Sequence, residues 1–165
     1  MSRPRLIPDA EIFAAILRQI AAGGEKSVAF SAIARATGLA APSLVQRYGA
    51  LSDMVQAAWL AEWDRLDALA DTALAEVDAA DKGPQALLKS LGPETSAALL
   101  AASQRDAALR DRAAHWRNKV EAALAARLRD AEAAAMLFAA WQGQLLWQGA
   151  GDKGFKLKDA IKRLG

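Results

Sequence analysis

The sequence contains no cysteine and a single histidine, His115. Without thiols the chain cannot build a disulfide framework, a Cys-based zinc finger, an iron–sulfur site or a thiol nucleophile. Asp111 lies four residues before His115, a spacing that can hold a metal on one helix face, but two ligands are too few for a site. We therefore expect no metal and no cofactor.

Long apolar runs are also missing. The longest, Ala133 to Trp141, is about half of the roughly 20 residues that a membrane helix needs. The first residues, Met-Ser-Arg-Pro-Arg followed by Asp9 and Glu11, lack the apolar segment of a signal peptide. These absences predict a cytoplasmic protein with no membrane partner.

The sequence is poor in proline and glycine and rich in alanine. The 165 residues include 42 alanines but only 5 prolines and 11 glycines, which stand mostly between apolar stretches. Alanine favours helices and is depleted in strands. The sequence therefore predicts an all-α fold.

The net charge of +2 hides an uneven distribution. Residues 1–50 hold six Lys/Arg and three acids, for a net +3, and residues 51–165 hold fifteen and sixteen, for a net −1. A basic N-terminal module is typical of nucleic-acid binding, although ordinary surface solubility explains it equally well. The charge difference separates residues 1–50 from residues 51–165 but does not decide between these two explanations.

Apolar residues at helical spacing, with glycine and proline between the segments, predict the helix boundaries. The first helix covers 10–22, with Asp9 as its N-cap and Gly23-Gly24 as its stop. The further helices are expected at 30–37, 42–48, 52–80, from Pro84 to Gly92, 94–103, 106–128, 130–148 and 155–164.

The second and third segments have the pattern of a helix-turn-helix motif. Ala34 is small enough for two helices to cross closely, and Gly38 tolerates the positive φ of a tight turn. Leu39 and Leu44 supply the apolar side chains that anchor the turn and the following helix. The pattern Ala–x3–Gly–Leu–x4–Leu thus indicates a recognition helix after Gly38.

At these residues, from Ile33 to Trp59, the sequence resembles the TetR family of bacterial transcriptional regulators, and the likeness extends over 10–60. It implies a helix-turn-helix DNA-binding domain at 1–50, a helical regulatory and dimerisation domain at 51–165 that binds a ligand, and a two-fold dimer. Tyr48 stands where the family usually has Phe. The sequence departs from the family in having Ala29 for a capping Thr, and Val45 and Leu51 for the Tyr and Lys that usually contact phosphate.

The recognition helix leaves several residues outside its Leu44/Tyr48 core face. Gln can pair with adenine, and Arg with guanine or phosphate. The candidate DNA contacts are Ala41, Pro42, Ser43, Gln46 and Arg47, with Arg3 and Arg5 as an arm that either enters a minor groove or is a frayed terminus.

Five tryptophans stand out in residues 51–165. Aromatic walls with a few amides suit a pocket for an apolar or aromatic ligand, although each ring alone is equally well explained as core packing. The candidate ligand-binding residues are Trp59, Trp63, Trp116, Trp141, Gln142 and Trp147.

Residues 131–147 are apolar on nearly all sides, so a helix there needs cover on most of its surface. A second copy of this small chain would supply it. The candidate dimer-interface residues are Met136, Phe138, Leu145, Leu146, Phe155 and Ile161.

Together these features predict a ligand-responsive, homodimeric repressor that binds a double-stranded DNA operator and is released by a small-molecule effector. One alternative is a helical protein-interaction module with a vestigial helix-turn-helix, given Val45 and Leu51. An enzyme is disfavoured, because no nucleophile, acid–base set or phosphate-binding loop is evident.

Overall fold

The computed structural model describes residues 7–93, 95–151 and 154–164. Over these residues the chain is helical and contains no strand, which confirms the all-α prediction. The elements are α1 (Asp9–Gly23), a 3-10 helix η1 (Glu25–Ser27), α2 (Phe30–Thr37), α3 (Ala41–Tyr48), α4 (Leu51–Ala79), α5 (Pro84–Leu91), α6 (Ala97–Arg105), α7 (Ala107–Leu128), α8 (Ala131–Trp147) and α9 (Leu157–Leu164). None of the described helices has the length and apolarity to span a bilayer.

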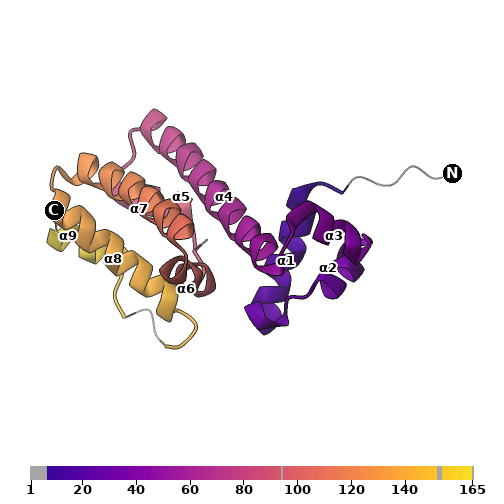
Figure 1. Cartoon of the computed structure of the whole chain (residues 1–165). Helices are drawn as coiled ribbons and strands as arrows, with labels where there is room; N and C mark the ends of the chain where they lie inside the picture. Colours follow the sequence, from indigo (N-terminus) through magenta and orange to yellow (C-terminus); the bar gives the residue numbers. More distant parts are fainter. Residues whose placement is uncertain (1–6, 94, 152–153, 165) are drawn as a thin grey trace.

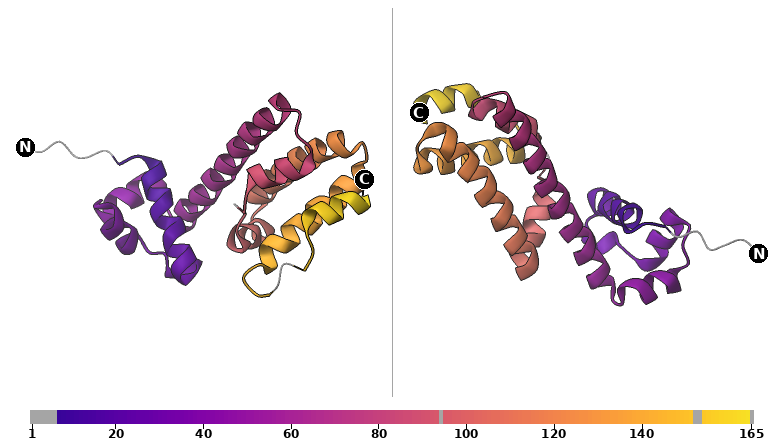
Figure 2. Two further views of the ribbon diagram at one scale, coloured as in Figure 1. Left: turned by 180° about the vertical axis from the view of Figure 1, so that it is seen from behind. Right: turned by 90° about the horizontal axis from the view of Figure 1, so that it is seen from above.

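Helix α4 joins two helical groups. Figure 1 shows α1, α2 and α3 gathered at the N-terminal end of α4, with α5 to α9 along the rest of its length. The views in Figure 2 show the same separation from behind and from above. With 29 residues, α4 is roughly 43 Å long. It packs on α1 and α3 near its start and on α5 and α7 farther along, so it belongs to both groups.

The N-terminal group has its own apolar centre. Ile12, Ile16 and Ile33 are fully buried, and Leu44 is the one fully buried residue of α3. Gly38 ends α2 with φ +74°, and its N–H donates to Ala34 O at 2.8 Å. The glycine at the turn and the inward Leu44 are therefore where the sequence pattern predicted them.

Most helix ends lie within one residue of the sequence-based expectation, and the largest differences are at α6 and α9. Helix α1 begins at Asp9 itself after Pro8, and no side chain caps it. Helix α6 begins at Ala97 because the Ser96 side chain accepts from the Leu99 N–H at 3.1 Å; Glu94, its expected start, lies outside the described residues. The last helix begins at Leu157 rather than Phe155.

Candidate functional site

Helix α3 presents a polar surface on the outside of the N-terminal group. Ser43, Gln46 and Arg47 are exposed together with Pro42, whereas Ala41 is half-buried. The side chains of Ser43 and Gln46 make no hydrogen bond to any described residue. Both are therefore available for contacts with another molecule.

Arg47 has a different environment, because its guanidinium is engaged within the chain. Nη1 donates to the carbonyl oxygen of Ile7 at 2.9 Å, and Nη2 lies 2.9 Å from Oδ1 of Asp9. The guanidinium carbon also lies 5.7 Å from the centre of the Tyr48 ring. Arg47 thus ties α3 to the start of α1. The other basic candidates, Arg3 and Arg5, lie outside the described residues.

Tyr48 completes this arrangement. Its hydroxyl donates to Oδ1 of Asp9, and its ring packs 6.0 Å from the ring of Phe13. Burial, with the hydrogen bond to Asp9, raises the pKa of the Tyr48 phenol well above its usual range. The hydroxyl therefore stays protonated and remains a donor to the Asp9 carboxylate.

The three positions that depart from the family pattern differ in their surroundings. Val45 is 45% exposed on α3, and Leu51 is half-buried against the apolar core. Ala29 precedes α2 without a side-chain cap. None of these three side chains can donate a hydrogen bond to phosphate.

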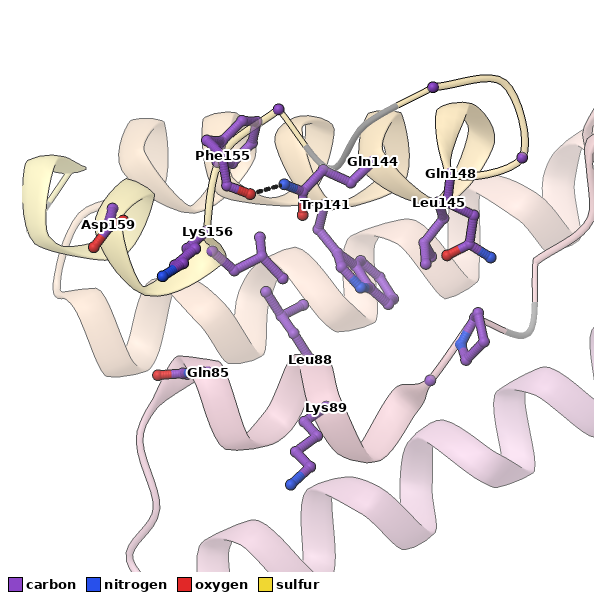
Figure 3. Close-up of a pocket in the computed structure, with 16 residues that line it drawn as sticks. Gln85, Leu88, Lys89, Trp141, Gln144, Leu145, Gln148, Phe155, Lys156 and Asp159 are labelled. Atoms are coloured by element: carbon purple, nitrogen blue, oxygen red, sulfur yellow. Dashed lines mark hydrogen bonds between the residues drawn. The ribbon is translucent and has the colours of Figure 1, made fainter.

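A second candidate site lies between α5, α8 and α9. It is an open hollow of about 1630 Å³ whose wall includes Trp141 of α8 and Leu88 of α5. Figure 3 shows these two side chains converging, with Leu145 and Phe155 nearby and Gln144 donating to the carbonyl oxygen of Phe155. Polar groups at the rim include Gln85, Lys89, Gln148, Lys156 and Asp159. The composition suits an aromatic or apolar compound with a polar periphery.

Three of the five tryptophans form a buried cluster with Phe138. Trp116 lies 5.9 Å from Trp63 and from Phe138, and 6.3 Å from Trp141, between ring centres. The indole N–H of Trp63 donates to Ser103 Oγ at 3.1 Å. Trp63 and Trp116 are therefore core residues that do not line the hollow, whereas Trp141 belongs to both the cluster and the hollow.

The remaining ligand candidates are dispersed. Gln142 accepts a hydrogen bond from Thr95 at 3.0 Å, and its buried Nε2 has no acceptor among the described residues. Trp147 is 71% exposed at the end of α8, and Trp59 lies in the first half of α4. These residues share a residue type and not a place, and among the predicted ligand-binding residues only Trp141 lines the hollow.

Large apolar side chains are exposed around α8 and the segment after it. Met136, Leu146 and Phe155 are each between 43% and 49% exposed, and Trp147 is 71% exposed. We call these four residues the α8 apolar surface. Leu145 and Ile161 are half-buried, and Phe138 is only 8% exposed because it packs on Trp116 and Trp141. Phe138 is thus a core residue of its own chain rather than part of this surface.

A polar junction between the two helical groups was not expected from the sequence. Oε1 of Glu25 in η1 accepts from the Trp59 indole at 3.1 Å, and both carboxylate oxygens accept from Arg105 at the end of α6. Beside it, Gln56 donates to Asp106 at 2.6 Å. Because 80 residues separate Glu25 from Arg105, no local sequence pattern could have predicted the pair.

Asp106 also caps α7, since its side chain accepts from the Leu109 N–H at 3.0 Å. This hydrogen bond and the one from Gln56 hold the pKa of Asp106 below its usual range. A smaller hollow of about 440 Å³, lined in part by Trp59, opens at the same junction. The ionised Asp106 therefore fixes the start of α7 next to α4.

Comparison with known proteins gives a consistent picture of the fold. No family model and no curated protein matches the chain. Among solved structures, the multidrug binding protein EbrR, determined with malachite green, superposes with a TM-score of 0.69 at 23% identity over 96% of both chains. A candidate transcriptional regulator, SCO7518 of Streptomyces coelicolor A3(2), gives a TM-score of 0.69 at 20% identity over 94% of both chains. The chain therefore has the fold of the TetR-like regulators along nearly its whole length.

Proposed function

We propose that the protein is a dimeric, one-component transcriptional regulator, a repressor whose α3 binds operator DNA and whose C-terminal helices bind a small effector. The observation that carries this proposal is the exposed Ser43 and Gln46 face on a helix that a Gly38 turn and a buried Leu44 hold in place. Such a helix can lie in the major groove with its outer side chains on base edges. The resemblance to regulators in fold supports the same assignment.

The effector site is the hollow beside Trp141. Its aromatic and aliphatic wall gives apolar contact area, and the glutamine and lysine groups at its rim can orient a ligand. A neighbour in fold binds malachite green, a large aromatic molecule. We therefore assign the effector to planar aromatic or amphiphilic compounds.

The α8 apolar surface serves as the dimer interface. An exposed group of Met, Leu, Phe and Trp side chains is typical of a surface that another protein covers. A second copy related by a two-fold axis would bury the same residues on both chains. It would also place two α3 helices on one DNA duplex, as a pseudo-palindromic operator requires.

Packed side chains connect the effector site to the DNA-binding group. Trp141 contacts Trp116, Trp116 contacts Trp63, and Trp63 donates to Ser103 on α6. Two residues later on α6, Arg105 holds Glu25 of η1. A ligand that displaces Trp141 would thereby change how α6 holds the N-terminal group, and with it the spacing of the two α3 helices. The ligand needs only to favour one of the two arrangements.

The test uses a fluorescently labelled duplex from the region upstream of the protein's own gene, with malachite green as the effector probe. We expect the wild type to bind the duplex, and the dye to quench tryptophan fluorescence and release the DNA. Gln46→Ala should weaken binding by an amount that depends on the operator sequence, whereas Gln104→Ala, an exposed glutamine on α6, should not. Absence of wild-type binding at low salt would contradict the proposal.

One observation favours a second candidate function. Val45 exposes an apolar side chain at the middle of α3, and Arg47 is already occupied within the chain. A helix-turn-helix that has lost its phosphate contacts would serve as a protein-interaction surface instead. Such a protein would show no DNA retention with the steep salt dependence that phosphate contacts produce.

A further inference from the structure

The carboxylate of Asp9 is bound by side chains of α3, the proposed recognition helix, as an external anion would be. It accepts from the Tyr48 hydroxyl and pairs with Arg47, so both of these α3 side chains are directed to one acidic group. Asp9 lies in the first turn of α1, where its charge suits the helix dipole, but its hydrogen bond and ion pair are made with α3. Its side-chain interactions are with α3, 38 or more residues away in the chain.

The ion pair between Arg47 and Asp9 lies where a DNA phosphate would compete with Asp9 for the guanidinium. The side chains of Arg47 and Asp9 are 35% and 50% exposed, so the ion pair lies at the surface and not in the core. A guanidinium with Nη1 on the Ile7 carbonyl and Nη2 on Asp9 has two of its donors committed. A phosphate oxygen that approaches α3 meets a cation already neutralised and a carboxylate that repels it.

We propose that Asp9 is a restraining residue for Arg47. In the DNA-free chain it holds the guanidinium against the start of α1, and DNA binding exchanges the carboxylate for a phosphate oxygen. This inference rests on the proposed function, because it requires that α3 binds DNA. It gives Asp9 a part in setting affinity without any contact between Asp9 and DNA, and it lets Arg47 bind phosphate only after its release from Asp9.

The experiment compares two variants that remove one negative charge from the same helical turn. Glu11 is exposed in the first turn of α1, as Asp9 is, and its side chain makes no hydrogen bond or ion pair with Arg47 or Tyr48. Asp9→Asn and Glu11→Gln therefore lose the same charge and the same interaction with the helix dipole, but only the first releases Arg47. Asn also keeps an oxygen that can accept from Tyr48. Dissociation constants are measured for the upstream duplex and for a scrambled duplex of the same composition.

We expect Asp9→Asn to bind both duplexes about fivefold more tightly than Glu11→Gln does, which is the upper range for releasing a surface ion pair. In an Arg47→Ala background the two variants should bind equally. Equal affinities of Asp9→Asn and Glu11→Gln with Arg47 present, or weaker binding by Asp9→Asn, would overturn the inference while wild-type binding still upholds the proposed function. A wild type that binds neither duplex would overturn both.

Discussion

The N-terminal helical group and helix α8 differ in how much their sequences reveal. Helices α2 and α3 mix apolar residues with Ser, Thr, Gln and Arg, so each helix has one inward face, and Ile33 and Leu44 are the buried residues. In α8 nearly every residue is apolar, and the helix buries Leu137 and Trp141 while it exposes Met136 and Trp147. When a helix has a polar side, its sequence predicts which side is buried. When it has none, only the packing of the neighbouring helices determines which side is buried.

The largest effect should come from the aromatic cluster. Trp63→Ala removes a ring that is 2% exposed and leaves Ser103 without its donor. We expect the free energy of unfolding to fall by about 3–5 kcal/mol in urea denaturation. The matched control is Trp147→Ala, which truncates the exposed tryptophan and should change the stability of the monomer by no more than about 0.5 kcal/mol. Equal losses would mean that the two rings are not differently packed.

The α8 apolar surface can be tested by placing a charge on it. Leu146→Glu puts a carboxylate in the proposed interface, which should cost several kcal/mol of dimerisation free energy. Sedimentation at micromolar concentration should show a wild-type dimer and a monomeric variant with unchanged helix content. Ala131→Glu, at the exposed first position of α8 and about four turns before Leu146, tests whether any charge on this helix suffices. A monomeric wild type would contradict the assignment.

One glycine in each of the two regions sharpens the comparison between the N-terminal group and α8. Replacing it by alanine should lower the stability in the first and raise it in the second. A Cβ at Gly38 or at Gly143 would meet no neighbouring atom within 4 Å. Gly38 has φ +74°, so Gly38→Ala should destabilise the N-terminal group by roughly 1–2 kcal/mol through backbone strain alone. Gly143 is within α8, so Gly143→Ala should stabilise the protein by up to about 1 kcal/mol. Thermal unfolding of both variants measures the signs.

A smaller effect is expected at the junction between the two groups. Arg105→Gln removes the bidentate contact to Glu25, an exposed pair that contributes little to stability. We expect DNA affinity without effector to change by less than about twofold, but malachite green to release DNA less completely. Arg112→Gln, which breaks the exposed pair with Asp64 between α7 and α4, is the control and should leave the release unchanged. Identical release curves for both variants would exclude the junction as the route of coupling.

The sequence predicted much of this fold because the residues that start and stop its helices act locally. Gly38, Pro42 and Gly49 mark helix ends of α2 and α3, and the buried anchors Ile33 and Leu44 lie within five residues of them. The Ser96 cap was missed because Pro93 and Glu94 looked like the natural start of α6. A single capping hydrogen bond decides such a boundary, and apolar spacing does not reveal it.

The candidate sites were predicted less completely, since they depend on contacts between distant segments. Arg47 was predicted as a DNA contact from its place on α3, but its pairing with Asp9 joins residues 38 positions apart. Trp63 and Trp116 were grouped with Trp141 by residue type, and only the packing of α4, α7 and α8 shows that they lie behind the hollow. Residue types were enough to predict candidate residues. The tertiary fold determines which of these residues can reach a ligand.

The most direct test of the central assignment is hydroxyl-radical footprinting of the wild type on the duplex upstream of its own gene. A dimer with one α3 helix in each of two major grooves should protect two segments about one helical turn, or a small multiple of a turn, apart. The Ser43→Ala/Gln46→Ala variant should lose this pattern while it still folds and dimerises. Uniform or absent protection by the wild type at low salt would contradict the assignment of α3 as a DNA-reading helix.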